Sequence, residues 1–457
     1  MLFIFTRNKY YFLILLLHTL IAIAATNNRF FIIGWFYVTA ITSVFWTFHN
    51  KNIDNPLSFF IVYLASMELI GRIVLASPYM PYETSKYLMF VLLLYGIFVQ
   101  KHNKGTLGYL LIMLLVPAFF FDLSGEVKIS DFIFNILGPI NVGLAVIYFW
   151  RQQFSYTGFI NLLRLIYYPL FLVLVYTFIR TPNFEDIEFK LGSNFAVSAG
   201  FGTNQVSTIM GLGMFLSFVF YIKNWPLSGD KVLDLFLTLA FAFQGLLTFS
   251  RGGMIIAFAG IIIMLIFPQE KTIPLKLSRQ LKFITPALIL LYAGFKVANS
   301  ITGGKLLLRY QGETEGTLAG TKEKDIDVLT SNRASIFLGD VELFFQNPLL
   351  GVGAGASRYI RPKETGTIAH VELSRLLAEH GMLGLIYFVL LLYPGVKLYK
   401  KMRYTVNGNL KFALYMIALG STFHAATRTF VTPLLFGLSF VEILPASNEQ
   451  IENTIDR

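Results

Sequence analysis

The sequence predicts an all-α polytopic membrane protein with about 12–14 transmembrane helices and a large, partly helical loop outside the cytoplasm. Of its 457 residues, 55% are hydrophobic and only 14% are charged. A soluble domain carries about a quarter charged residues. The mean hydropathy is +0.62, and apolar runs of span length recur along the chain. Most of the chain must therefore lie in the bilayer.

The apolar runs are predicted to be helices and not strands. Lipid cannot satisfy backbone groups, so the alternative to helices is a closed barrel, whose strands alternate polar and apolar residues. Runs such as residues 10–25 do not alternate. This first run lacks a clear small-x-small cleavage site before a polar mature region, and another apolar run begins at Phe30. We therefore expect it to be a retained helix and not a signal peptide.

The predicted spans follow one another from the N-terminus. They are residues 10–26, 29–48, 56–78, 86–100, 107–123, 131–150, 160–179, 203–222, 232–249, 253–268, 282–298, 379–398, 410–427 and 430–445. If one of the last two short runs is re-entrant, only the orientation of the tail changes.

The charges in the short loops predict a cytoplasmic N-terminus. Cytoplasmic loops carry an excess of Lys and Arg, whereas loops assigned to the outside, such as residues 78–83 and 122–131, are poor in them. The basic residues assigned to the inside are Arg7, Lys9, Lys51, Lys101, Lys104, Arg151, Lys223, Lys231, Lys271, Lys276, Arg279, Lys282, Lys397, Lys400, Lys401, Arg403 and Lys411.

By composition the chain divides into several parts. Residues 1–298 carry the first eleven predicted helices, residues 299–378 form the loop expected to carry catalytic residues, residues 379–445 carry the C-terminal transmembrane helices, and residues 446–457 form a polar tail. A connection as long as this loop is usually functional or disordered. Its apolar pairs, such as Phe344-Phe345, indicate that it folds.

The net charge and the lack of cysteine narrow the possible functions. The net charge is +11, but the basic residues lie mostly in short loops, where they set topology, so no nucleic-acid partner is predicted. Without cysteine, the chain has no disulfides, thiolate metal sites or cysteine nucleophiles. Neither a metal nor a cofactor is predicted.

Arg251 stands between two apolar runs, residues 232–248 and 254–267. A guanidinium at the membrane is costly without an anionic partner, so it indicates a functional site. Arginine also binds phosphate through two parallel hydrogen bonds. The alternative is that Arg251 reaches lipid headgroups. The predicted orientation places it on the outside, with the loop 180–203 and the long polar loop.

Three features of the long loop are candidates for chemistry. Asn332-Arg333 precedes an amphipathic run. The glycines of residues 351–355 permit a tight turn and a close backbone approach to a ligand. His370 precedes a predicted helix at the membrane edge, and an ordinary histidine pKa near 6.5 suits proton transfer. There are two alternatives to a catalytic role for His370. It is either an ordinary surface histidine or a metal ligand together with Glu372, and the metal site is disfavoured because it lacks further ligands.

Two pairs of opposite charge have helical spacing. Glu68 and Arg72, and likewise Arg375 and Glu379, are four residues apart. Such pairs neutralise each other on one helix face, so both are predicted to be structural. A catalytic carboxylate at Glu379 is the alternative.

Several short motifs follow one another in a fixed order. They are Ser250-Arg251-Gly252, Asn332-Arg333, Asn347-Pro348-Leu349-Leu350-Gly351-Val352-Gly353-Ala354-Gly355, and His370 followed by Glu379-x-Gly381-x-x-Gly384. Over about residues 195–400, this ordered set resembles the O-antigen ligase and O-antigen polymerase superfamily. The resemblance implies a metal-independent, inverting glycosyltransferase of the GT-C type. It would use a glycan on undecaprenyl pyrophosphate at the periplasmic face of the bacterial inner membrane.

The resemblance also implies roles for individual residues. Arg251 and Arg333 would hold the pyrophosphate, and His370 would activate the acceptor hydroxyl. The chemistry agrees, because a glycosyl pyrophosphate needs mainly charge stabilisation and a base. Val371 departs from the family, many of whose members carry a polar residue, often Asn, after the histidine. Further candidates for binding substrate are Ser250, Asn332, Tyr310, and the pair His424 and Arg428, which is predicted to share one helix face.

The implied partners are an undecaprenyl-pyrophosphate-linked glycan as donor, lipid A-core or a lipid-linked glycan as acceptor, and membrane lipids. The compact histidine-to-glycine motif favours a ligase, which uses lipid A-core, over a polymerase, which joins lipid-linked repeats. The next alternative is a protein O-oligosaccharyltransferase with a Ser or Thr acceptor. A lipid-linked glycan flippase is the rival from another class. It predicts charges through the centres of many spans and internal repeats, and the sequence shows neither.

Overall fold

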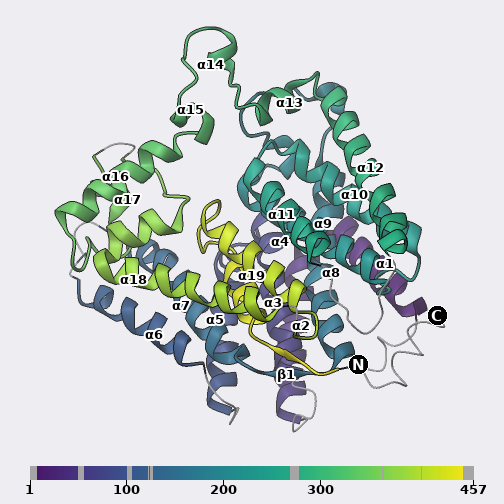
Figure 1. The fold of residues 1–457 in the computed structure, drawn as a ribbon, viewed down its shortest axis with the longest axis horizontal. Coiled ribbons are helices and arrows are strands. Elements are labelled where there is room, and N and C mark those ends of the chain that lie inside the picture. The colour runs from purple at the N-terminus through teal and green to yellow at the C-terminus, as the bar shows by residue number, and fades with distance from the viewer. Residues whose placement is uncertain are drawn as a thin grey trace.

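The computed structural model describes residues 8–49, 56–99, 105–121, 123, 127–267, 277–362, 365–402 and 404–445, which fold almost wholly into α-helices (Figure 1). Within these residues, 7 helical segments are long and apolar enough to cross a membrane. They are α1 (Asn8–Asn27), α2 (Phe30–His49), the unit of α3 (Pro56–Ser66) and α4 (Glu68–Ile73), α7 (Ile129–Phe149), α8 (Tyr156–Arg180), α9 (Thr203–Lys223) and α18 (Glu372–Lys401). The predicted all-α polytopic class is confirmed.

Shorter helices complete the apolar part. They are α5 (Thr84–Val99), α6 (Thr106–Leu115) with the 3-10 turn η2 (Val116–Phe120), α10 (Lys231–Leu247), α11 (Arg251–Ile266), α12 (Leu277–Ile301), α19 (Gly408–Thr422) and α20 (Val431–Leu438). Most predicted spans agree with these helices to within a few residues. The figure of 12–14 spans stays a prediction, because several of these helices are short. The predicted tail, residues 446–457, lies outside the described residues.

The helices that cross the core differ in how much of their surface the protein covers. In the apolar window of the α3–α4 unit 94% of residues are buried, whereas the figures are 33% for α1 and 22% for α2. Apolar side chains on α1 and α2, such as Leu20 and Phe45, are exposed. These two helices therefore present apolar side chains to the bilayer, and α3 with α4 lies inside the bundle.

The two ends of the bundle differ in character. At one end β1 (Gln153–Phe154) pairs in parallel with β2 (Glu442–Ile443). This end lies opposite the polar segment that carries α14 (Glu315–Leu318) and α15 (Ile326–Thr330) (Figure 1). Arg151 forms an ion pair of 3.8 Å with Glu442 there, and Lys411 Nζ donates to the Val441 carbonyl at 3.0 Å. Both are among the basic residues predicted to face the cytoplasm. Arg7, Lys51, Lys101, Lys104, Lys271, Lys276 and Arg403, which carry the same prediction, lie outside the described residues.

The long polar loop folds, as predicted, into short helices. They are α13 (Lys305–Tyr310), α14 (Glu315–Leu318), α15 (Ile326–Thr330), α16 (Arg333–Gln346) and α17 (Ser357–Ile360). The predicted boundary at residue 378 falls inside α18, just before a kink at Gly381, where φ is 60°. The loop and the following span are therefore joined through one bent helix.

Glu68 and Arg72 form the predicted structural ion pair, and two more charges join it. Arg72 also pairs with Glu83 at 2.8 Å, and Lys86 pairs with Glu83 at 2.9 Å. The cluster holds equal numbers of positive and negative side chains, all buried. Self-neutralisation is what allows such charges inside a membrane protein.

Candidate active site

Arg251 begins α11 and joins this helix to the polar segment above it. Its Nη1 donates to the Arg309 carbonyl at 3.1 Å, and its Nη2 donates to the Leu329 carbonyl at 2.5 Å. Ser250 precedes it at the N-cap, and the Ser250 hydroxyl donates to Asn204 Oδ1 at 2.8 Å. The guanidinium is thus held in a fixed orientation at the end of the bundle that carries the polar segment.

Arg309 is a second arginine at this place, and it was not predicted because it belongs to no recognisable motif. Its side chain is buried, and Nη2 donates to the Ser331 hydroxyl at 3.0 Å. Burial, together with Arg251 and Arg333, lowers the pKa of Arg309 to about 10. Three guanidinium groups therefore repel one another here. An anion bound among them would relieve that repulsion.

Arg333 begins α16 and contacts a histidine from the C-terminal part of the chain. Its Nη1 lies 3.2 Å from Nδ1 of His424, whose Nε2 lies 3.2 Å from the Asn204 carbonyl. Burial is the main cause that lowers the pKa of Arg333, and Arg251 adds to it. Segments far apart in the sequence thus bring Arg251 and Arg333 together, as the site prediction requires.

The prediction that His424 and Arg428 share one helix face is wrong. Helix α19 ends at Thr422, so both residues lie in the loop that follows it. Their side chains go to different partners: His424 contacts Arg333, whereas Arg428 donates to the Ala369 carbonyl. The prediction failed because it extended the span past Thr422, where no Gly or Pro marks the end of the helix.

His370 lies between these groups, just before α18. Arg428 Nη1 approaches its Nδ1 to 3.5 Å. Burial is the main cause that lowers the pKa of His370 to about 3, followed by Arg428, Arg333 and His424. The half-buried imidazole is therefore neutral near pH 7, and burial and the nearby cations also make it a weak base unless a bound anion offsets their charge.

The arginines of this site lack the partner that most buried arginines of the protein have. Among the described residues, none of half-buried Arg251 and Arg333 and buried Arg309 and Arg428 forms an ion pair with a carboxylate. Elsewhere, buried Arg72, Arg361 and Arg375 each have a carboxylate partner, and buried Arg164 instead donates to the Pro226 carbonyl and to Asn161. A buried cation without an anion is costly. The arrangement is that of a site whose counter-charge comes from a ligand.

Two other predicted substrate-binding residues lie beside this cluster. Asn332 is exposed, with φ at 62°, and directly precedes Arg333 at the N-cap of α16. Tyr310 packs its ring edge-on against Phe295, with centroids 6.0 Å apart. The structure therefore uses the Tyr310 ring in packing, and the role of either residue toward a sugar stays a prediction.

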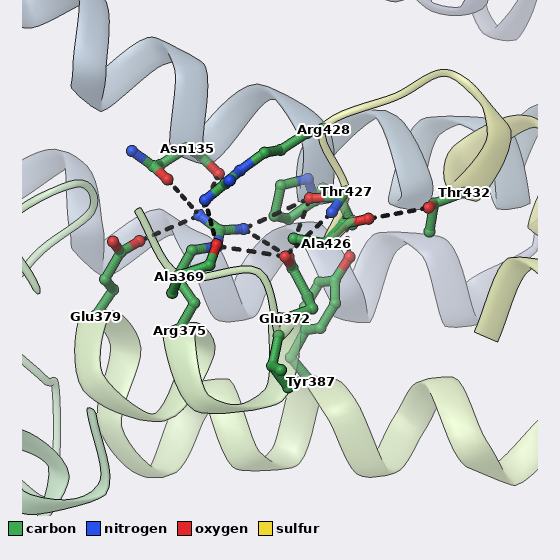
Figure 2. A network of polar contacts seen from close by, with 12 residues as sticks. Asn135, Ala369, Glu372, Arg375, Glu379, Tyr387, Ala426, Thr427, Arg428 and Thr432 are labelled. Carbon is green, nitrogen blue, oxygen red and sulfur yellow. Dashed lines mark hydrogen bonds and ion pairs between the residues drawn. The ribbon is translucent and has the colours of Figure 1, made fainter. Parts of the chain in front are cut away.

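Arg375 is the centre of a buried polar network (Figure 2). It forms ion pairs with Glu372 at 2.5 Å and with Glu379 at 3.2 Å, and its Nη1 donates to the Asn135 carbonyl at 2.8 Å. Thr427 donates its hydroxyl to Glu372 at 3.0 Å. Glu379 is thus part of a structural ion pair, as expected. The network fastens the loop that bears His424 and Arg428 to α18.

The backbone of the glycine-rich motif, residues 351–355, closely approaches the backbone of α18. From the sequence, a close approach to a ligand was expected instead. Val352 N donates to the Ala378 carbonyl at 2.9 Å, and Gly353 N donates to the Glu379 carbonyl at 3.0 Å. A Cβ on Gly381 would lie 2.7 Å from the Leu349 backbone. The motif therefore docks on the kink of α18 and has the close backbone contact that only glycine permits.

Replacing Gly381 with alanine is expected to lower the free energy of unfolding by more than about 2 kcal/mol. The substitution adds left-handed backbone strain and a collision with the Leu349 backbone. Thermal unfolding in detergent measures the loss. Gly303→Ala is the matched control, because φ there is also +60° but nothing lies within 4 Å of the added Cβ. Equal losses in the two variants would contradict the docking role of Gly381.

No metal cluster is found in the described part of the chain, where no group of three or more His, Asp or Glu side chains is placed to hold an ion. Glu372, the residue considered with His370 as a ligand pair, is engaged by Arg375 and Thr427. The expectation of a metal-independent site stays a prediction.

Compared with models of protein families, the chain matches none. No curated protein matches it either.

Proposed function

We propose that this chain is a membrane glycosyltransferase that moves a glycan from undecaprenyl pyrophosphate to an acceptor hydroxyl, most simply an O-antigen ligase-like enzyme acting on lipid A-core. The observation that carries the proposal is that Arg251, Arg309 and Arg333 lie close together without carboxylate partners, and that Arg333 and Arg428 lie near the neutral His370. The ordered motifs of the sequence point to the same reaction. The alternatives stand in the order polymerase, protein O-oligosaccharyltransferase and flippase.

In this reaction the acceptor oxygen attacks the anomeric carbon from the face opposite the pyrophosphate. The bond from that carbon to the phosphate oxygen breaks, and the pyrophosphate leaves with the electron pair. Arg251, Arg309 and Arg333 stabilise the charge that develops on it. The proton of the attacking hydroxyl passes to His370 and then to water. The configuration at the anomeric carbon is inverted.

The contact between Arg428 and His370 has a consequence for this step. A guanidinium only donates, so the Nδ1 atom that it faces is the unprotonated nitrogen of the neutral ring. The hydroxyl proton must therefore go to Nδ1, and Arg428 must first turn away from it. The contact is long, at 3.5 Å, so His370 loses little when a bound pyrophosphate attracts Arg428, whose bond to the Ala369 carbonyl must then also be rearranged.

The low pKa of His370 predicts an unusual pH dependence. A lowered pKa leaves the ring in its base form until the pH approaches about 3. We therefore expect kcat/KM, which reports the free enzyme, to stay nearly constant from about pH 7.5 down to about pH 5.5. For a histidine with the ordinary pKa, the fraction in the base form would be about tenfold lower at about pH 5.5. A matching fall in kcat/KM of the wild type, if a variant lacking His370 does not show it, would contradict the environment described for this residue.

Arg251→Lys is expected to lower transfer about 100-fold although the charge is kept. Lysine cannot reproduce the fork that reaches both the Arg309 and Leu329 carbonyls and that would grip a phosphate. Initial rates with a purified lipid-linked donor measure the effect. Arg151→Lys, at the opposite end of the bundle and exposed, is the control. Near wild-type transfer by Arg251→Lys would remove the phosphate-binding role.

Deleting the gene and comparing the surface glycan with the undecaprenyl-linked pool tests the proposal, with His370→Ala in the complementing copy. Long polymer stranded on undecaprenyl pyrophosphate is the result expected of a ligase. Single repeats on lipid or on core indicate a polymerase. Loss of glycan from a protein indicates an oligosaccharyltransferase. Lipid-linked glycan trapped on the cytoplasmic face indicates a flippase and overturns the enzyme assignment.

A further inference from the structure

The two nitrogens of His424 have contacts that define its protonation state. Nε2 faces the Asn204 carbonyl at 3.2 Å, and a carbonyl only accepts. Nδ1 faces Nη1 of Arg333 at 3.2 Å, and a guanidinium only donates. The proton is therefore on Nε2, the ring is neutral, and Nδ1 accepts from Arg333. A neutral ring with both nitrogens engaged is poorly suited to bind an anion itself.

The surroundings of His424 fix the ring in this orientation. Its side chain is only 2% exposed. A Cβ on Gly252 would collide with the ring, so the glycine after Arg251 makes room for the histidine. Asn204 accepts from His424 through its carbonyl and from the Ser250 hydroxyl through Oδ1. One residue thus ties the start of α11, which bears Arg251, to the histidine that contacts Arg333.

We propose that His424 is a positioning residue that orients the Arg333 guanidinium toward the diphosphate, and that it does not bind the ligand. The inference rests on the proposed function, because it names the residue that sets the geometry of that anion site. Asn204 and Gly252 complete the arrangement from the side of Arg251. The distance between the two predicted phosphate-binding arginines then depends on a contact between segments that are remote in sequence.

Binding of inorganic pyrophosphate to the purified full-length protein tests the inference by isothermal titration calorimetry. Both His424→Ala and Arg333→Ala are expected to raise the Kd about tenfold. Arg333→Ala removes the charge-assisted contact with the diphosphate, and His424→Ala removes the partner that positions Arg333 for that contact. The double variant is expected to bind no more weakly than Arg333→Ala alone, since His424 acts only through Arg333. His424→Asn, whose Oδ1 can take the place of Nδ1 as acceptor, is expected to restore most of the affinity. Pairing His424→Ala with a substitution at Arg251 should give more nearly additive losses.

Three results would overturn the inference while leaving the anion site intact. The first is wild-type affinity for pyrophosphate in His424→Ala, and the second is an additive loss of affinity when His424→Ala is combined with Arg333→Ala. The third is failure of His424→Asn to restore binding although its unfolding temperature is that of the wild type. If the wild-type protein itself does not bind pyrophosphate, the proposed function fails first. In transfer assays the positioning role predicts that His424→Ala changes the KM for donor more than kcat, and that His424→Asn changes either one little.

Discussion

Replacing His370 with alanine is expected to lower transfer about 100- to 10,000-fold, the range typical of a lost general base. The imidazole is neutral, half-buried and placed between Arg428 and Arg333, and burial and these charges keep its pKa at about 3. The expected loss is in kcat, because the proton moves only in the chemical step. Single-turnover rates with a lipid-linked donor measure it.

Pyrophosphate binding provides the internal control for this variant. His370 contacts Arg428 but is not itself a cation, so His370→Ala is expected to bind inorganic pyrophosphate at least as well as the wild type. An equal loss of binding and of rate would mean that the residue shapes the anion site and is not the base.

Asp340→Asn is expected to lower the free energy of unfolding by about 3–5 kcal/mol, because it leaves a buried guanidinium without its counter-charge. Arg361 pairs with Asp340 at 2.7 Å, and both side chains are 0% exposed. Ser374 donates to the other carboxylate oxygen at 2.7 Å. Since Asp340 lies on α16 and Arg361 begins the segment that leads to His370, the pair also sets the position of His370 relative to Arg333.

Thermal unfolding in detergent measures this effect, with two matched variants. Asp186→Asn changes an exposed aspartate and is expected to be neutral. Asp340→Leu combined with Arg361→Met removes both charges, and because apolar side chains of similar size can replace a buried pair, most of the stability should return. If the double variant is as unstable as Asp340→Asn, the loss comes from packing and not from the unpaired charge.

Much of the fold could be predicted because the bilayer leaves few alternatives for a long apolar run. The predicted span 203–222 differs from α9 (Thr203–Lys223) by one residue at one end. The C-terminal spans were predicted less well. The predicted span 410–427 runs past Thr422, where α19 ends, because no Gly or Pro there shows that the backbone leaves the helix.

The candidate site was predicted in part. Arg251, Arg333 and His370 were proposed from motifs, and the structure places Arg333 near both of the others. Arg309 was missed because it stands in a short leucine-rich helix, where a basic residue has no distinctive spacing. The glycine motif was assigned to a ligand because sequence cannot show which backbone approaches which. Here the neighbour is the kink of α18 at Gly381.

The carbonyl partners of Arg251 affect how the enzyme would recover after each reaction. A carboxylate partner would compete with every incoming anion and would have to be displaced against a full charge. The Arg309 and Leu329 carbonyls carry only partial charges, so they keep the guanidinium aligned in the empty site and give way to a diphosphate. If the proposed function holds, the same carbonyls would take the guanidinium back when the product leaves. The backbone would then keep the site ready between turnovers without a mobile counter-ion.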